Sequence, residues 1–517
     1  MTDVRARLGF LAGAVITALL FGLLAMNVGR VAPEAPSELA RAGIPAGPAD
    51  TKADDPALDE EREEQAEGTE LRVEAWEKAV REGKAGQNGK RMYLKTAAGS
   101  GAAAAPAPGG WVGEIPVDPT ADDWEPAIAA DPAAPYVYIL TTRYGSSKPC
   151  PGNCPTPYMA LTISADGGAT WGPSKPLCAC KGSGQFDPII EVVPNTGAVY
   201  AVYMNGYNIM FTKSTNHGAT WSAPVKTYGN VSWNDKPVIA VSDSGQDVYI
   251  SFNGPTGGDP WVARSSNAGA SWSQAKLVDS ARYYFAFDAD VAPDGTVYFG
   301  ESSLQYGGGG NKGTTPTGTI DEHLFISRDR GATWTNKVVA STYPGIACVA
   351  AGCSPDFYLG HDAVTADANG ALTYVYDGAT AAGGKQSIYA TRSTNQGTTW
   401  STPAVISTAG EEATAPMIES RGAGVIVAAW QETSGGGNVD AWNTVSRRSA
   451  DGGATWAAPI RISDATSGAA YKDAAGYDEI YGDYGEMAIT NGGKAIAVWG
   501  EGLSYTGPGG VWLNRER

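Results

Sequence analysis

The chain has 517 residues, a formal net charge of −18 and three histidines. An acidic surface argues against a nucleic-acid partner, because such a partner needs a basic face. The 67 glycines, 15 tryptophans and 24 tyrosines are typical of an all-β protein with aromatic strands and tight turns.

The sequence predicts a membrane-targeting segment near the N-terminus. Residues 8–28 are an uninterrupted apolar run, long enough to cross a bilayer as a helix. Arg5 and Arg7 precede the run, which favours a cytoplasmic N-terminus. We expect residues 1–30 to be a cytoplasmic stub and a transmembrane anchor that leaves the rest of the chain in the periplasm or at the cell surface. A cleaved signal peptide is the alternative, and it would make the protein secreted.

Residues 31–109 do not have the composition of a packed domain. Residues 58–83 are heavily charged and are compatible with a solvated helix, whereas residues 97–110 are rich in Ala, Pro and Gly. We interpret this region as a linker between the anchor and a domain over residues 110–517.

The cysteines agree with export from the cytoplasm. Six cysteines in an exported chain predict disulfides, although spacing leaves the connectivity open. Metal binding is less well supported, because the first two pairs have no histidine nearby. The cysteines form three close pairs in the sequence: Cys150 and Cys154, Cys178 and Cys180, and Cys348 and Cys353.

An octapeptide with the pattern S-x-[DN]-x-G-x-[TS]-W occurs six times. Its Asp or Asn side chain can bind backbone N–H groups just ahead, and its Gly supplies a position with positive φ. Its Trp starts the next strand and carries a large apolar surface between neighbouring units. The copies are residues 164–171, 214–221, 265–272, 327–334, 393–400 and 449–456.

This octapeptide resembles the Asp-box, or BNR repeat, and residues 110–517 resemble the sialidase-like Asp-box β-propellers. The resemblance implies four strands per blade, with each box in the turn between strands 3 and 4. An apolar inner hairpin occurs seven times against six boxes, and residues 110–117 resemble the fourth strands. We therefore predict seven blades, with residues 110–117 completing the last blade, and six blades as the alternative.

The predicted topology separates two faces. The boxes lie on one face, whereas the cysteine pairs and the long insertions fall in the 2–3 and 4–1 loops of the other. Long loops on a rigid scaffold usually carry function. We therefore look for the site at the mouth of the central channel on the loop face.

Carboxylates recur where the inner strands begin. They are candidates for a Ca²⁺ site, for an acid/base pair in glycoside cleavage, or for bonds to the backbone of a neighbouring blade. Tyr484, beside Glu486, is a candidate nucleophile, because a phenol needs a carboxylate partner. The catalytic candidates are Asp187, Asp288, Asp483, Tyr484 and Glu486. The substrate-binding candidates are Glu125, Arg143, Arg282, His361 and Asp362.

The resemblance to sialidases also implies three arginines that hold the substrate carboxylate. We expect only Arg143 and Arg282 to reach the loop face, and the family's Phe-Arg-Ile-Pro segment is absent. We therefore favour a propeller that recognises a glycan or a cell-surface protein. A glycoside hydrolase, either an exo-sialidase or a carboxylate-pair enzyme, is the alternative. Aromatic candidates for sugar stacking are Trp261, Tyr283, Tyr284, Tyr306, Tyr343, Tyr471 and Tyr477.

Overall fold

The computed structural model describes residues 109–517 except 119–120, 145–154, 156, 178–183, 233, 255–257, 281, 307–315, 346–359, 434–441, 464–471, 474–475, 478–484 and 503–508. The predicted anchor, the linker up to residue 108 and all six cysteines lie outside these residues. Within the described ranges, no helix is long and apolar enough to cross a membrane.

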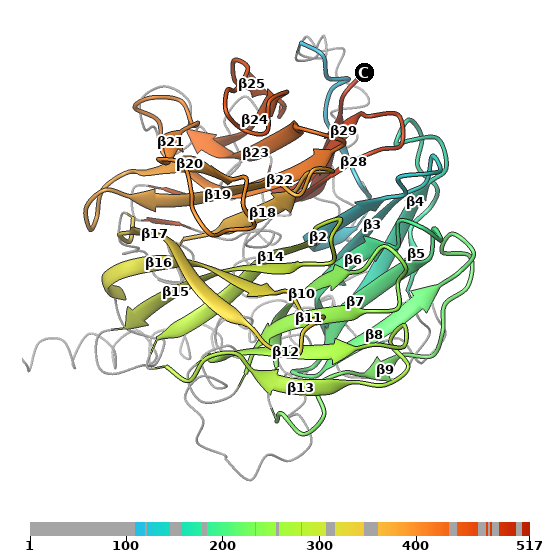
Figure 1. The fold of residues 1–517 in the computed structure, drawn as a ribbon. Helices are drawn as coiled ribbons and strands as arrows, with labels where there is room; N and C mark the ends of the chain where they lie inside the picture. The colour runs from blue at the N-terminus through green and yellow to red at the C-terminus, as the bar shows by residue number, and fades with distance from the viewer. Residues whose placement is uncertain are drawn as a thin grey trace, which may run out of the picture. The chain divides into compact units, whose positions relative to one another are not determined.

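Seven four-stranded antiparallel sheets make up the described part of the chain (Figure 1). We number them as blades 1–7 in the chain order of their innermost strands. Blade 1 is β2 (Asp122–Ala130), β3 (Val137–Tyr144), β4 (Tyr158–Ser164) and β5 (Lys175–Pro176). Blade 2 is β6 (Gln185–Val192), β7 (Val199–Asn205), β8 (Ile209–Ser214) and β9 (Val225–Lys226). Blade 3 is β10 (Asp235–Val241), β11 (Val248–Asn253), β12 (Pro260–Ser265) and β13 (Ser273–Lys276).

The remaining blades follow the same order. Blade 4 is β14 (Tyr283–Val291), β15 (Val297–Tyr306), β16 (Pro316–Ser327) and β17 (Thr335–Thr342). Blade 5 is β18 (Asp362–Ala366), β19 (Leu372–Ala379), β20 (Gln386–Ser393) and β21 (Ala404–Val405). Blade 6 is β22 (Ala413–Arg421), β23 (Val425–Thr433), β24 (Trp442–Ser449) and β25 (Ile460–Arg461). Blade 7 is β28 (Glu486–Ile489), β29 (Ala495–Gly502), β30 (Gly509–Arg515) and β1 (Ile115–Pro116). A small hairpin, β26 (Lys472–Asp473) with β27 (Gly476–Tyr477), precedes β28.

The innermost strands close a ring. Each packs against the innermost strand of the next blade, and β28 of blade 7 packs against β2 of blade 1. Blade 7 takes its outer strand from the N-terminal end of the domain, because Ile115 pairs with Leu513 and Pro116 with Trp512. The N–H of Val112 also donates to the carbonyl of Arg515 at 3.0 Å. The prediction of seven blades closed by residues 110–117 is confirmed, and the six-bladed alternative is wrong.

Apolar side chains fill the spaces between blades. The tryptophan that ends each octapeptide packs against one of these layers. Trp171, for example, contacts a cluster that includes Ile128 of blade 1 and Ile496 of blade 7. The predicted role of the octapeptide tryptophan between neighbouring units is confirmed by these contacts.

All six octapeptides fold into the same turn between the third and fourth strands. The serine Oγ accepts a hydrogen bond from the glycine N–H at 2.8–2.9 Å. The Asp or Asn Oδ1 accepts one from the Thr or Ser N–H, also at 2.8–2.9 Å. The octapeptide glycine has the expected positive φ. The residue before it also has a positive φ, and in four copies that residue is not a glycine: His217, Ala268, Arg330 and Gln396.

Candidate functional site

Four of the seven inner strands have a strained residue near their start on the loop face, which carries the 2–3 and 4–1 loops. A β-bulge interrupts the pairing near the start of β2, β6, β10 and β22. At each bulge a non-glycine residue with φ between 44° and 51° precedes a proline, namely Glu125, Asp187, Lys236 and Ala415. The positive φ of each of these four residues costs roughly 1 kcal/mol of backbone strain. Two of the predicted site residues, Glu125 and Asp187, are therefore held at the channel mouth in an unusual backbone conformation.

Buried acids line the central channel, a cavity of about 300 Å³. Five of the acidic residues that line it are half-buried and come from four blades: Glu191, Asp288, Asp290, Glu419 and Glu486. Each is partly accessible from the channel but surrounded by protein. Burial raises the pKa of Glu191 to about 7, and the nearby Asp290 adds to this shift. Burial, reinforced by the neighbouring carboxylates, also raises the pKa of Asp288, Glu419 and Glu486 well above their ordinary values.

Several of these carboxylates join neighbouring blades. Asp288 accepts a hydrogen bond from the N–H of Val364 at 2.9 Å, and Asp290 accepts one from Ala366 at 2.7 Å, both on blade 5. Glu486 of blade 7 accepts a hydrogen bond from the N–H of Ile128 on blade 1. These are the contacts that a purely structural role requires, so a catalytic role of Asp288 and Glu486 stays a prediction.

Glu125 and Asp187 make the equivalent contact at the channel mouth. The N–H of Asp187, on blade 2, donates to the Oε2 atom of Glu125, on blade 1, at 3.0 Å. Asp187, Lys236, Phe287 and Glu486 line a small cavity of about 50 Å³ there. Two of the predicted catalytic residues, Asp187 and Glu486, therefore lie near each other, whereas Asp483 and Tyr484 lie outside the described residues.

A second acidic group is sealed between blades 4 and 5. Glu322 is 0% exposed and Asp362 is 1% exposed. Among the described residues, no hydrogen bond to the carboxylate oxygens of either side chain is found. His361 lies beside them, with its Nδ1 atom 3.1 Å from Oδ2 of Asp377. The predicted substrate-binding residues His361 and Asp362 are thus buried in the wall of the channel.

Metal binding finds little support in this part of the chain. Among the described residues, no group of three His, Cys, Asp or Glu side chains is arranged to hold a metal ion. Ca²⁺ therefore stays a prediction of the sequence.

Arg143, the first predicted loop-face arginine, is occupied by its own blade. Its Nε and Nη2 atoms bind the two carboxylate oxygens of Asp123 at 2.6 and 2.8 Å. Its Nη1 atom binds Ser174 Oγ at 2.8 Å and lies 3.0 Å from Oδ2 of Asp118. The residue is 6% exposed, so its contacts hold the start of blade 1 together.

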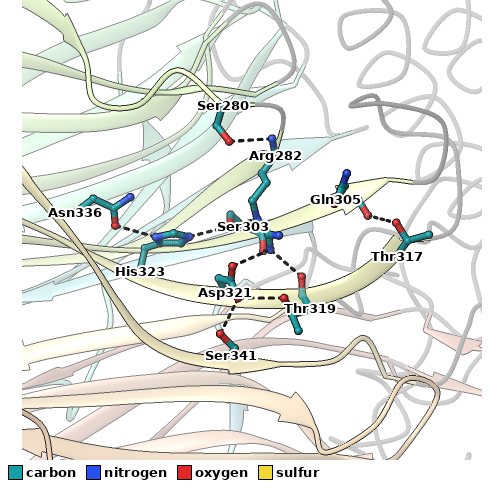
Figure 2. A network of polar contacts seen from close by, with 10 residues as sticks. All are labelled: Ser280, Arg282, Ser303, Gln305, Thr317, Thr319, Asp321, His323, Asn336 and Ser341. Carbon is teal, nitrogen blue, oxygen red and sulfur yellow. Dashed lines mark hydrogen bonds and ion pairs between the residues drawn. The ribbon is translucent and has the colours of Figure 1, made fainter.

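Arg282, the second such arginine, directly precedes β14, and its side chain reaches Ser303 of β15 and Thr319 of β16 (Figure 2). Its Nε atom donates to Ser303 Oγ at 2.8 Å, and Nη2 donates to the carbonyls of Ser303 and Thr319, both at 2.7 Å. Nη2 also lies 3.4 Å from Oδ2 of Asp321. The Arg282 side chain is 23% exposed and that of Asp321 is 22% exposed, so this pair reaches the surface.

A chain of polar side chains stands behind Arg282, with Ser303 and His323 buried and Asn336 exposed (Figure 2). Ser303 Oγ lies 2.8 Å from Nε2 of His323, and Nδ1 of His323 lies 2.8 Å from Oδ1 of Asn336. Burial lowers the pKa of His323, so its ring is neutral at pH 7. We call Ser303, His323 and Asn336 the relay.

The aromatic candidates divide between the core and the surface. Tyr283 and Tyr284 are 1% and 3% exposed and belong to the core, and Trp261 is half-buried. Tyr343 is 38% exposed. It lies two residues after Ser341, whose Oγ donates to Asp321 Oδ1 at 2.7 Å. Tyr343 itself follows the last residue of β17, and its backbone pairs with Ala379 of blade 5. The side chains of Tyr306, Tyr471 and Tyr477 lie outside the described part.

Some functional candidates were missed by the sequence reasoning. Glu191 and Glu419 each stand three residues after the proline of a bulge, so an alignment of the repeats could have found them. Asp321, His323 and Asn336 have no such signal, because they meet through the register of β15, β16 and β17.

No family model matches the sequence, and no curated protein matches it. Among solved structures, the chain is similar to a protein of unknown function from Dyadobacter fermentans DSM 18053, with 12% identity, 78% of this chain and 98% of that chain covered, and a TM-score of 0.43. It is also similar to an ulvan lyase from a new family of polysaccharide lyases, with 12% identity, coverage of 78% and 95%, and a TM-score of 0.45. A Trypanosoma rangeli sialidase matches with 13% identity, coverage of 76% and 54%, and a TM-score of 0.37. The propeller assignment rests on the strand pairing described above and not on these similarities.

Proposed function

We propose that the chain is an exported, membrane-anchored Asp-box propeller that recognises a glycan on its loop face. The observation that carries this proposal is the surface patch formed by Arg282, Asp321 and Tyr343, which we call the blade-4 patch. It combines an exposed aromatic ring with a partly exposed ion pair at the end of the blade where the long loops emerge.

The chemistry of the blade-4 patch suits a sugar. A sugar ring offers an apolar C–H face that packs on an aromatic side chain, and hydroxyl groups that both donate and accept hydrogen bonds. Arg282 supplies donors and Asp321 supplies acceptors, and the exposed Tyr343 follows by two residues Ser341, which binds Asp321. A rigid scaffold that presents such groups requires little ordering when a ligand binds.

An exo-sialidase is less well supported. Its chemistry needs arginines whose guanidinium groups are available to a carboxylate. Arg143 is instead bound by Asp123 and Asp118. Two of the five donors of Arg282 are likewise given to carbonyls of its own blade.

A carboxylate-pair glycosidase is the second candidate. It is supported by the raised pKa of Asp288 and Glu486, because a carboxyl group that stays protonated near neutral pH can act as a general acid. The backbone hydrogen bonds of both groups support the structural role instead.

The proposed membrane anchor rests on the apolar run of residues 8–28 and on the arginines before it.

The test uses the full-length protein in detergent micelles on a glycan array. We expect binding that Tyr343→Ala reduces at least tenfold. Tyr136→Ala is the matched control, since Tyr136 lies in a 1–2 turn on the opposite face and stacks on His217. Binding only to proteins, or glycan binding that is insensitive to the Tyr343 substitution, would refute the proposal.

Hydrolysis of fluorogenic glycosides that Asp288→Asn abolishes would establish the glycosidase. The membrane anchor is tested by a protease-accessibility assay. If the anchor exports the propeller, protease added outside the cytoplasmic membrane should digest it.

A further inference from the structure

The Arg282 guanidinium uses two of its three nitrogens in hydrogen bonds to its own blade. Its Nε and Nη2 atoms are bound by Ser303 and by the carbonyl of Thr319. Among the described residues, Nη1 has no hydrogen-bond partner. Because the group is planar and its other two nitrogens are fixed, the direction of the Nη1 donors is fixed as well.

Asp321 presents an acceptor next to this donor. Its Oδ1 atom accepts from Ser341 Oγ at 2.7 Å and from Thr319 Oγ1 at 3.2 Å. Its Oδ2 atom makes a longer ion pair with Arg282, at 3.4 Å, and a carboxylate oxygen can accept more than one hydrogen bond. A fixed donor and an open acceptor therefore stand side by side at the surface.

We infer that Arg282 and Asp321 form a subsite for two adjacent hydroxyl groups of an uncharged sugar. One hydroxyl oxygen accepts from Nη1 of Arg282, and its neighbour donates to Oδ2 of Asp321. An acidic sugar fits less well, because its carboxylate would lie beside Asp321 on a chain of net charge −18. This inference rests on the proposed function and names the class of sugar that the blade-4 patch takes.

The relay holds the Arg282 side chain in place through the hydrogen bond between Arg282 Nε and Ser303 Oγ. Arg282 Nε can only donate, so Ser303 Oγ accepts there and donates its own proton to Nε2 of His323. The neutral ring then carries its proton on Nδ1 and donates it to Asn336 Oδ1. This is the one direction of donation that satisfies all three contacts. His323 touches no ligand and acts as a positioning residue for Arg282.

A matched pair on the other face supplies the control. Arg330 and Asp247 also form an ion pair, with Nε 2.9 Å from Oδ2 and Nη2 2.7 Å from Oδ1. Arg330 belongs to an octapeptide turn and Asp247 to a 1–2 turn, so this pair lies away from the loop face. A change in overall charge or in general stability would affect both pairs alike.

The experiment measures sugar affinity by ligand-observed NMR with the full-length protein in micelles. The probes are methyl α-mannoside and methyl β-galactoside, which are neutral, and glucuronic acid and sialyllactose, which are acidic. We expect the neutral probes to bind more tightly, and Arg282→Lys or Asp321→Asn to weaken them at least tenfold. Arg330→Lys and Asp247→Asn should leave the affinity unchanged.

The outcomes separate the two proposals. If neither these probes nor an array glycan binds, the proposed function fails, and the inference fails with it. If glycans bind through Tyr343 but acidic probes bind best, or the Arg282 and Asp321 variants bind normally, only the diol subsite is wrong.

The positioning role of the relay is tested separately, by the tautomer of His323. The ¹⁵N spectrum should show His323 protonated on Nδ1 alone, and the chain has only three histidines to assign. Asn336→Leu should shift this tautomer and weaken the neutral probes several-fold. A shifted tautomer with unchanged affinity would show that the relay does not position Arg282.

Discussion

The Asp288 carboxylate accepts a hydrogen bond from the N–H of Val364, 2.9 Å away on the inner strand of the next blade. Its other oxygen accepts from the N–H of Ala289 at 2.8 Å. Glu125 and Glu486 bind the inner strands of their own neighbours in the same manner. Acidic side chains at the channel therefore bridge blades that share no strand pairing, and each provides an acceptor for a backbone N–H group.

Replacement of Asp288 distinguishes a structural from a catalytic role. Asp288→Ala leaves two N–H groups without their acceptor and should lower the free energy of unfolding by about 1–3 kcal/mol. Asp288→Asn keeps one acceptor oxygen and should cost less. Urea denaturation measures both values. A folded Asp288→Asn protein that loses glycoside hydrolysis at unchanged stability would show instead that the carboxyl group is catalytic.

Stability should fall as the pH rises, because of the buried glutamates. Glu301 is 1% exposed, and burial raises its pKa to about 8, whereas an unfolded glutamate has a pKa of about 4.3. The folded state therefore holds a proton that the unfolded state releases. The stability from this group is complete below about pH 4 and is lost as the pH rises to about 8, with a slope of roughly 1.4 kcal/mol per pH unit.

Glu301→Gln should remove this slope, because a glutamine does not titrate. The measurement is the urea midpoint between pH 5 and pH 9 for the wild type and the variant. Asp279→Asn is the control, since that side chain is 89% exposed. Parallel pH profiles of wild type and Glu301→Gln would contradict the argument. Glu191, with a pKa of about 7, contributes in the same direction.

The architecture was predictable because its signals are local. The octapeptide closes a turn through hydrogen bonds between groups two and four residues apart: Ser449 Oγ donates to Asp451 Oδ1 and accepts from the N–H of Gly453. Such a turn forms wherever its sequence occurs, so its repetition indicated blades. The closing strand was recognisable because residues 110–117 repeat the composition of the other fourth strands.

The candidate site was predictable only in part. Arg282 was named from the sequence because it was expected to reach the loop face, and Tyr343 because an aromatic ring suits sugar stacking. Their partners were not, because Asp321 and His323 are placed by shifts in strand register at Ser303/Gln305 and at Glu322/His323. Irregularities of this kind leave no periodic trace in the sequence.

The octapeptide turn should tolerate Asn but not Ala at its acidic position. The Thr455 N–H and hydroxyl donate to the two Asp451 oxygens at 2.8 and 2.6 Å, and Thr455 lowers the pKa of Asp451 to about 2. Asp451→Asn should leave the melting temperature nearly unchanged, because Asn216 makes equivalent contacts in its own turn. Asp451→Ala removes both acceptors and should lower it. Equal melting temperatures for the two variants would contradict the role of these bonds. The contribution of the Asp451 carboxylate to folding stability is present above about pH 4 and is lost as the pH falls toward 2.

Relief of backbone strain at the channel mouth should stabilise the fold. Ala415 has φ of 51° and is followed by a proline, so its Cβ is held in a region that alanine resists. Ala415→Gly removes that strain, and although glycine loses more entropy on folding, we expect a net gain of up to about 1 kcal/mol. Ala428→Gly is the matched control, because Ala428 is fully buried in β23 and paired on both sides, and this change should destabilise. If both variants lose stability equally in urea denaturation, the positive φ at Ala415 stores no strain that glycine can release.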